Sequence, residues 1–302
     1  MLNGSEQASS YTSPWPNLAR HFMHWVEPST MDAQTKRSSH YPLERREGEI
    51  ERLRAQGRAL IPDTEVMLDR MGITSGWTCL DLGCGPGGIA DLLSARVGSA
   101  GRVVGLDADP AFLDHARART RAANLKFVQG DAYRTGLPGG GFDLVHIRFL
   151  ASTAGRPEAL IREATRLARV GGIIALQEPD METLNCHPPD PAFMRLRAAL
   201  VGAFAAVGAD INIGRRLFGL ARGAGLEDVQ YRPFLLGFRS VDPLSDYLPS
   251  TVTSLRNTIL GAGLMTAAEL DVALAECRVH LRDPGTVSTI YTVTQVWGRK
   301  RD

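Results

Sequence analysis

Residues 80–88, with the sequence LDLGCGPGG, restrict the fold of this chain more than any other segment. An apolar run at 77–82 precedes them and an amphipathic run at 89–97 follows. This pattern predicts a strand, a glycine turn and a helix. Glycine has no Cβ, so its backbone can turn tightly and approach a ligand closely. The first turn of the following helix has unpaired N–H groups. We therefore expect the turn to hold a nucleotide-like ligand.

Two ligands fit this turn. Gly83, Gly85 and Gly88 make the spacing G-x-G-x-x-G that is typical of dinucleotide sites. Asp107 follows at about the 20 residues that such sites require. Asp81 favours another ligand, because a dinucleotide site usually has an apolar residue there and a carboxylate suits a cation better than a pyrophosphate. S-adenosylmethionine (SAM) carries an ammonium and a sulfonium but no phosphate. We expect SAM, with NAD(P) and a corresponding oxidoreductase as the alternative.

Several segments resemble, in order, the class I SAM-dependent methyltransferases. Residues 80–88 resemble motif I of that family. The segments that resemble its second to fifth strands, with the acidic residues at their ends, are 103–107 (VVGLD), 127–132 (FVQGDA), 142–146 (FDLVH) and 169–178 (RVGGIIALQE). The resemblance covers residues 43–180. It is closest to the small-molecule branch related to ubiquinone and menaquinone biosynthesis methyltransferases, which includes natural-product tailoring enzymes.

This resemblance implies an α/β fold with a Rossmann-like, seven-stranded sheet, helices on both faces, an N-terminal helical segment and helical cap insertions. It also implies an enzyme that moves a methyl group from SAM to C, N or O of a small organic acceptor in bacterial secondary metabolism. Fold alone does not fix function. A SAM-binding enzyme that does not methylate, such as a cyclase or decarboxylase, and a SAM-binding protein without catalysis remain alternatives.

The resemblance further implies which residues hold SAM. Asp81 would reach the ammonium, Asp107 the ribose hydroxyls and Asp131 the adenine amino group. Each acid has a structural alternative as a cap or turn residue. Tyr41 and Gln56 belong to a segment that resembles the helix packed over SAM in many relatives. The full set of expected cofactor-binding residues is Tyr41, Gln56, Asp81, Gly83, Cys84, Gly85, Gly87, Asp107, Ala108, Asp131, Ala132 and Arg148.

In methyl transfer the main task of the protein is to position the acceptor against the methyl group, because the cofactor already carries that group in activated form. A base is needed only if the acceptor must lose a proton. His146 and Arg148 share one face at the end of the fourth expected strand. His146 is a candidate base, with a buried hydrogen-bonded role as the alternative, and Arg148 could contact SAM or an acidic substrate. Glu178, after the fifth strand, is a second catalytic candidate. We expect no metal.

We expect four regions along the chain. They are a flexible, aromatic-rich segment at 1–40, a SAM-binding core at 41–185, a helical cap at 186–225, and the last core strands at 226–302 with a helical insertion near 242–284. The expected strands are 77–83, 102–107, 125–129, 142–147, 172–177, 229–238 and 287–296. The expected helices are 43–70, 87–97, 109–123, 156–168, 191–207 and 213–223. The aromatic segment could close the pocket across a dimer interface.

The composition of the chain limits the classes of binding partner that we expect. The net charge is +1, which gives no electrostatic reason to bind nucleic acid or an anionic membrane. No apolar run reaches the roughly 18 residues of a membrane helix, and no signal peptide is visible. The four cysteines form no metal-type C-x-x-C pair. We expect a cytoplasmic protein with a small-molecule substrate, and we leave assembly as a homo-oligomer open.

Overall fold

A seven-stranded sheet forms the centre of the chain. The structure is a computed structural model that describes residues 49–302. The strand order is β3-β2-β1-β4-β5-β10-β7. In that order the strands span Leu125–Gln129, Arg102–Asp107, Thr78–Leu82, Phe142–Arg148, Ala168–Asp180, Thr292–Arg299 and Glu227–Phe234. β1 to β5 are parallel, and β10 is antiparallel to both of its neighbours. The expected fold class is confirmed.

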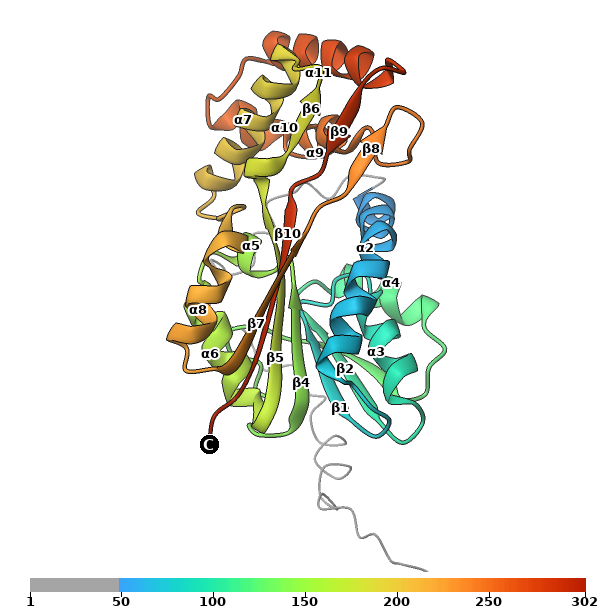
Figure 1. Ribbon diagram of the computed structural model, residues 1–302, viewed down its shortest axis with the longest axis vertical. Coiled ribbons are helices and arrows are strands. Elements are labelled where there is room, and N and C mark those ends of the chain that lie inside the picture. The colour runs from blue at the N-terminus through green and yellow to red at the C-terminus, as the bar shows by residue number, and fades with distance from the viewer. Residues whose placement is uncertain (1–48) are drawn as a thin grey trace, which may run out of the picture. The chain divides into compact units, whose positions relative to one another are not determined.

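Helices cover both faces of this sheet (Figure 1). One face carries α2 (Glu49–Met71), α3 (Ile89–Val97) and α4 (Pro110–Arg119), and the other carries α6 (Pro157–Leu167) and α8 (Leu217–Gly223). Successive side chains of β1 point to opposite faces of the sheet. Cys79 packs in the apolar cluster with α2 and α3, whereas Leu80 packs in the apolar cluster with α6 and α8. The sheet is thus apolar on both faces, as a doubly covered parallel sheet requires.

The chain order of the strands reverses between β1 and β4. β1 is followed on one side by β2 and β3, and on the other by β4 and β5. In open α/β sheets, ligands bind beyond the carboxyl ends of the strands at such a switch point. The glycine turn that follows β1 and the short helix α5 (Ala151–Ala154) that follows β4 lie at this edge.

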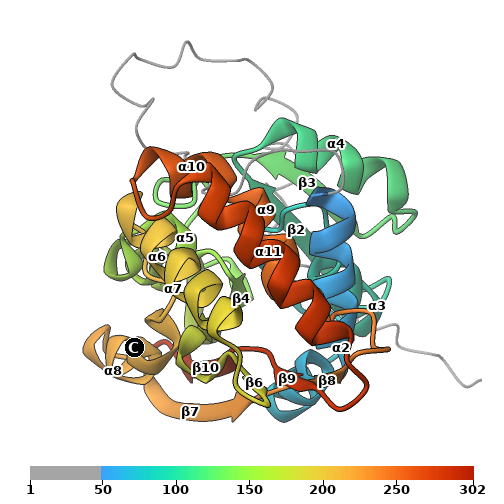
Figure 2. The ribbon, with the colours of Figure 1, turned by 90° about the horizontal axis from the view of Figure 1, so that it is seen from above.

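A second lobe stands beyond these strand ends. It consists of a three-stranded sheet, β6-β9-β8 (Asn185–His187, Val287–Thr289 and Gly237–Arg239), and the helices α7 (Pro191–Ala206), α9 (Tyr247–Ser254), α10 (Arg256–Gly261) and α11 (Ala267–Arg282). We call it the cap lobe. Its core is apolar and includes Phe193, Leu196, Leu200, Leu248, Val252, Ile259, Leu270 and Leu274. Seen from above, its helices lie in front of the strand ends (Figure 2).

The small sheet continues one edge of the large one. β5 leads through η2 (Met181–Thr183) to β6, β7 leads to β8 and β9 leads to β10, so the order β6-β9-β8 repeats β5-β10-β7. Two expected strands are therefore wrong as single strands. The run 229–238 divides into β7 and β8, and 287–296 divides into β9 and β10. Each run changes sheets at a short break, so the three chain segments carry the cap lobe on the main sheet.

The segment 186–225, expected as a helical cap, divides between the two lobes. α7 lies in the cap lobe, whereas η3 (Ile213–Arg216) and α8 pack against the main sheet through buried residues such as Leu217 and Ala221. The fifth strand is also longer than expected, because β5 runs from 168 to 180. Among the described residues no helix combines the length and apolar character needed to cross a membrane.

Candidate active site

The glycine turn is tied to the end of the neighbouring strand. Gly83 has a φ of 78°, and a Cβ there would lie 2.7 Å from Leu150 Cδ2, so only glycine fits without displacement. The N–H of Gly83 donates to the carbonyl of Leu106 at 2.7 Å. The N–H of Gly85 donates to Asp107 Oδ2 at 2.8 Å. The turn and the acid at the end of β2 therefore form one unit.

Asp107 does not cap helix α4, which was the structural alternative to its role in binding ribose. Its Oδ1 accepts the N–H of Asp109 at 2.9 Å. The N-cap of α4 is Asp109, whose side chain accepts the N–H of Ala111, and Pro110 is the first helical residue. Burial raises the pKa of the Asp107 carboxyl, partly offset by its two backbone hydrogen bonds. Each oxygen still has capacity for a ligand hydroxyl, as the ribose role requires.

The remaining cofactor candidates lie along the same edge. Asp131 follows β3, and its Oδ1 accepts the N–H of Tyr133 at 2.8 Å, so it also stabilises the turn containing Ala132. The carbonyl of Ala108 accepts from Gln129 at 3.2 Å. Cys84 is buried, which raises the pKa of its thiol and keeps it neutral. Tyr41 and the segment 1–40 lie outside the described residues.

Asp81 and His146 form a buried pair. They are register partners on β1 and β4, and Asp81 Oδ1 lies 3.0 Å from His146 Nδ1. Both side chains are almost fully enclosed. His146 Nε2 has no hydrogen-bond partner within the described part of the chain. The pair joins the two strands at the switch point. The ammonium contact for Asp81 and the base role for His146 stay predictions.

Glu178 holds the start of α5. Its Oε1 accepts the N–H groups of Leu150 at 3.0 Å and Ala151 at 2.8 Å, and its Oε2 accepts that of Ser152 at 3.1 Å. The side chain is fully buried, and this burial raises its pKa to about 7 despite the three backbone bonds. These contacts give Glu178 a structural role at the end of β4, and its catalytic role stays a prediction.

Four side chains form a row across adjacent strands beneath α2. Arg148 is in register with Gln177, Gln177 with Gln295, and Gln295 with Arg232. We call this the polar row. Polar residues in the middle of apolar strands are unusual. Gln177 in IIALQEPD and Gln295 in TVTQVW stand out in the sequence for this reason, although neither is among the predicted site residues.

Three members of the polar row have partners. Gln177 bonds to Thr64 of α2 at 3.2 Å, and Gln295 donates to the backbone carbonyl of Asp63 at 3.0 Å. Arg232 donates to Gln295 at 2.8 Å and pairs with the Asp63 carboxylate. Arg148 differs from them. Its Nη1 is shielded from solvent and has no hydrogen-bond partner in the described region.

Arg148 meets the cap lobe at an aromatic cluster. Its guanidinium lies 5.9 Å from the ring centre of Phe149. The ring of Phe149 contacts that of Tyr291 edge to face at 6.0 Å, and Tyr291 contacts Tyr247 at 5.6 Å. Gln56 of α2 donates to the Tyr291 hydroxyl. Burial raises the pKa of Tyr291 well above its usual range, so the phenol stays neutral.

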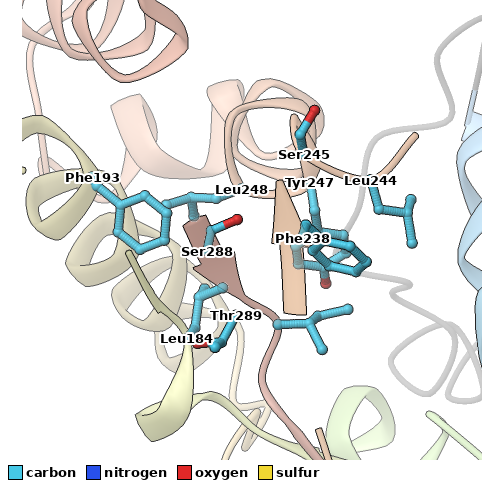
Figure 3. A pocket seen from close by; sticks show the side chains of 10 residues that line it. Leu184, Phe193, Phe238, Leu244, Ser245, Tyr247, Leu248, Ser288 and Thr289 are labelled. Atoms are coloured by element: carbon cyan, nitrogen blue, oxygen red, sulfur yellow. The ribbon is translucent and has the colours of Figure 1, made fainter. Parts of the chain in front are cut away.

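Two cavities lie away from the glycine turn. The first, with a free volume of about 10 Å³, lies in the cap lobe and is lined by residues including Phe193, Phe238 and Tyr247 (Figure 3). This volume is far below the roughly 300 Å³ at which small-molecule pockets begin. The second, of about 220 Å³, is lined by residues including Arg70, Trp297 and Arg299 and is also below that size. The described residues contain no cluster of histidine, cysteine or acidic side chains suited to a metal ion.

A Rossmann-like sheet with this order, a glycine turn after its first strand and an acid at the end of its second is typical of the class I SAM-dependent methyltransferases. Residues 79–172 match the model of a methyltransferase domain family. The chain therefore contains a class I methyltransferase domain, whose class uses SAM as cofactor. This family was the one expected from the sequence, and that expectation is confirmed.

Known proteins agree with this assignment. The chain is 35% identical over 156 residues to a trans-aconitate 2-methyltransferase of Paracidovorax citrulli, covering 51% of this chain and 57% of that protein. It is 32% identical over 123 residues to a demethylmenaquinone methyltransferase of Lactococcus lactis, covering 40% and 49%. The chain thus spans about half the length of these curated relatives.

A solved structure shows the same fold. The phosphoethanolamine N-methyltransferase 2 of Haemonchus contortus, in complex with phosphomonomethylethanolamine and S-adenosylhomocysteine, superposes with a TM-score of 0.51 at 15% identity. The superposition covers 82% of this chain and 53% of that one. At this identity the likeness concerns the fold alone.

Proposed function

We propose that this protein is a methyltransferase that moves a methyl group from SAM to a small organic acceptor at the carboxyl ends of β1 and β4. The observation that carries the proposal is the bond from the Gly85 N–H to Asp107, within a segment that matches a methyltransferase domain. This bond presents the glycine turn and the ribose-binding acid as one preformed surface. A preformed surface costs less ordering on binding.

Different residues of the site would bind different parts of the cofactor. The glycine turn would receive the methionine part, Asp107 the two ribose hydroxyls, and Asp131 with the Ala132 N–H the adenine. SAM supplies an electrophilic methyl group on its sulfonium when bound. The protein must then orient the acceptor and exclude water. The cap lobe, which stands over the strand ends, supports this second task.

His146 is the proposed base for acceptors that must lose a proton. Asp81 would fix the ring, because a carboxylate on Nδ1 orients the imidazole and directs Nε2 away from it. The unpartnered Nε2 is the atom that would accept the proton. Since His146 is enclosed in the folded chain, this role requires the acceptor to reach the end of β4 beneath the cap lobe.

We place the reaction in bacterial secondary metabolism in the cytoplasm. The four cysteines of the described chain are free and buried, which suits a reducing compartment. The net charge of +1 favours a small-molecule acceptor over nucleic acid.

Product analysis tests this function against its rivals. The purified protein is incubated with SAM and a panel of small organic acceptors, and S-adenosylhomocysteine is measured by mass spectrometry. Release that depends on the acceptor supports methyl transfer. Acceptor conversion with SAM left intact would instead support a cyclase or decarboxylase that uses SAM structurally.

A further inference from the structure

Among the described residues, Arg148 is the member of the polar row whose guanidinium has a nitrogen without a hydrogen-bond partner. The side chain is half-buried, and its Nη1 has no hydrogen-bond partner in the part of the chain described. Its neighbours in the row are joined to α2 through Thr64 and Asp63. Buried donors are almost always paired in folded proteins. An unpaired donor on a charged group at a strand end therefore points to a ligand.

The surroundings of Arg148 define the charge of that ligand. Burial lowers the pKa of the guanidinium, while the negative charge of Asp81 raises it. Asp81 is itself paired with His146. The negative charge of Asp81 repels any anion nearby. The repulsion is stronger for a dianionic group such as a phosphate than for a carboxylate, which carries one charge. A planar guanidinium also matches a carboxylate with two parallel hydrogen bonds.

The position of Arg148 indicates which molecule carries the carboxylate. The groups described beside it are Phe149, Tyr291 and Gly57, where a Cβ would lie 3.5 Å from Nη2. Phe149 and Tyr291 pack with the core of the cap lobe. The polar row runs from Arg148 toward β10, away from Asp107 and the glycine turn. Arg148, on β4, thus lies on the other side of β1 from Asp107, which is on β2, and next to the cap lobe.

We propose that Arg148 binds a carboxylate group of the acceptor, so that the acceptor is a carboxylic acid. This inference rests on the proposed function, because it requires a second substrate beside SAM. The methionine carboxylate of SAM offers the same chemistry, and the experiment below separates the two sources.

The cofactor arm uses two ligands that share a nucleoside. S-adenosylhomocysteine has a carboxylate and 5′-methylthioadenosine has none. Both are titrated by calorimetry into wild type, R148M and R148K, with R162Q as the control because Arg162 is an exposed arginine on α6. We expect each ligand to bind all four proteins within twofold. A tenfold loss for S-adenosylhomocysteine alone in R148M would place the carboxylate on the cofactor and overturn the acceptor assignment. No binding of either ligand to wild type would instead overturn the proposed function.

The acceptor arm uses pairs of small molecules that differ only in charge, such as benzoate with benzamide and citrate with its trimethyl ester. The thermal unfolding midpoint is measured with each molecule in the presence of S-adenosylhomocysteine. We expect at least one acid, and none of the neutral partners, to raise the midpoint of wild type and R162Q. The shift should vanish in R148M and partly return in R148K. Equal shifts for acids and neutral partners, no shift with any acid, or shifts unchanged in R148M would overturn the inference.

Turnover gives the final comparison. Methyl transfer to an acid that shifts the midpoint should lose about a hundredfold in kcat/KM in R148M, as expected when the charged hydrogen-bond partner of a carboxylate is lost. An unchanged kcat/KM would overturn the inference. The unfolding midpoint of each variant without ligand shows whether it is folded.

Discussion

Asp81 on β1 and His146 on β4 are joined by a 3.0 Å contact between a carboxylate oxygen and Nδ1, and both side chains are buried at the switch point of the sheet. Either residue alone would leave a buried polar group without its partner. We therefore expect Asp81→Ala to lower the free energy of unfolding by about 2–3 kcal/mol, measured by urea denaturation.

A surface pair provides the control for this prediction. Asp69 is paired with Arg96, but the Asp69 side chain is 65% exposed. Asp69→Ala should cost at most about 1 kcal/mol, because exposed ion pairs contribute little. Equal losses for the two variants would show that the Asp81–His146 contact adds nothing to stability.

Glu178 should make stability depend on pH. Its native pKa is raised to about 7 from 4.5, mainly by burial. The native state therefore holds a proton that the unfolded state has released between these values, and the free energy of unfolding should fall as the pH rises from about 4.5 to about 7. The fall attributable to this residue is at most about 3 kcal/mol. Glu178→Gln should remove that part of the slope in urea titrations at several pH values. A variant with the wild-type slope would show that Glu178 does not titrate in this range.

Gly83 should not tolerate a side chain. Alanine there would adopt a positive φ and place its Cβ 2.7 Å from Leu150. We expect Gly83→Ala to cost about 2 kcal/mol in stability and to weaken SAM binding, because the turn must shift. Gly219→Ala is the matched control, since no atom lies within 4 Å of its Cβ position on the exposed face of α8. The control should gain up to about 1 kcal/mol. Comparable effects at both positions would argue against a constrained turn.

The sequence predicted the parallel half of the sheet closely. β1 to β4 lie within a residue or two of their expected positions, because each is a short apolar run bounded by glycine or charged residues. The prediction failed where one continuous run of strand-forming residues contributes strands to two sheets. Residues 287–296 are rich in β-branched side chains throughout, so nothing local marks the change at Ile290 and Tyr291.

The site was predictable only where its residues are close in sequence. The turn around Gly85 and the acid at 107 follow from one motif. The polar row does not, since Arg148, Gln177 and Gln295 meet only through strand register set by the whole sheet. The unpaired Nη1 of Arg148 depends on how α2 and the aromatic cluster surround it, which no local pattern encodes.

The central claim is that the surface built by Gly85 and Asp107 binds SAM. The most direct measurement is calorimetric titration of SAM, NAD and NADP into wild type, Asp107→Asn and Asp114→Asn, where Asp114 is an exposed acid on α4. We predict micromolar SAM binding to wild type and Asp114→Asn, a loss of about 10- to 100-fold in Asp107→Asn because a charged hydrogen-bond acceptor is removed, and no dinucleotide binding. Dinucleotide binding without SAM binding, or equal SAM affinity in all three proteins, would contradict the account.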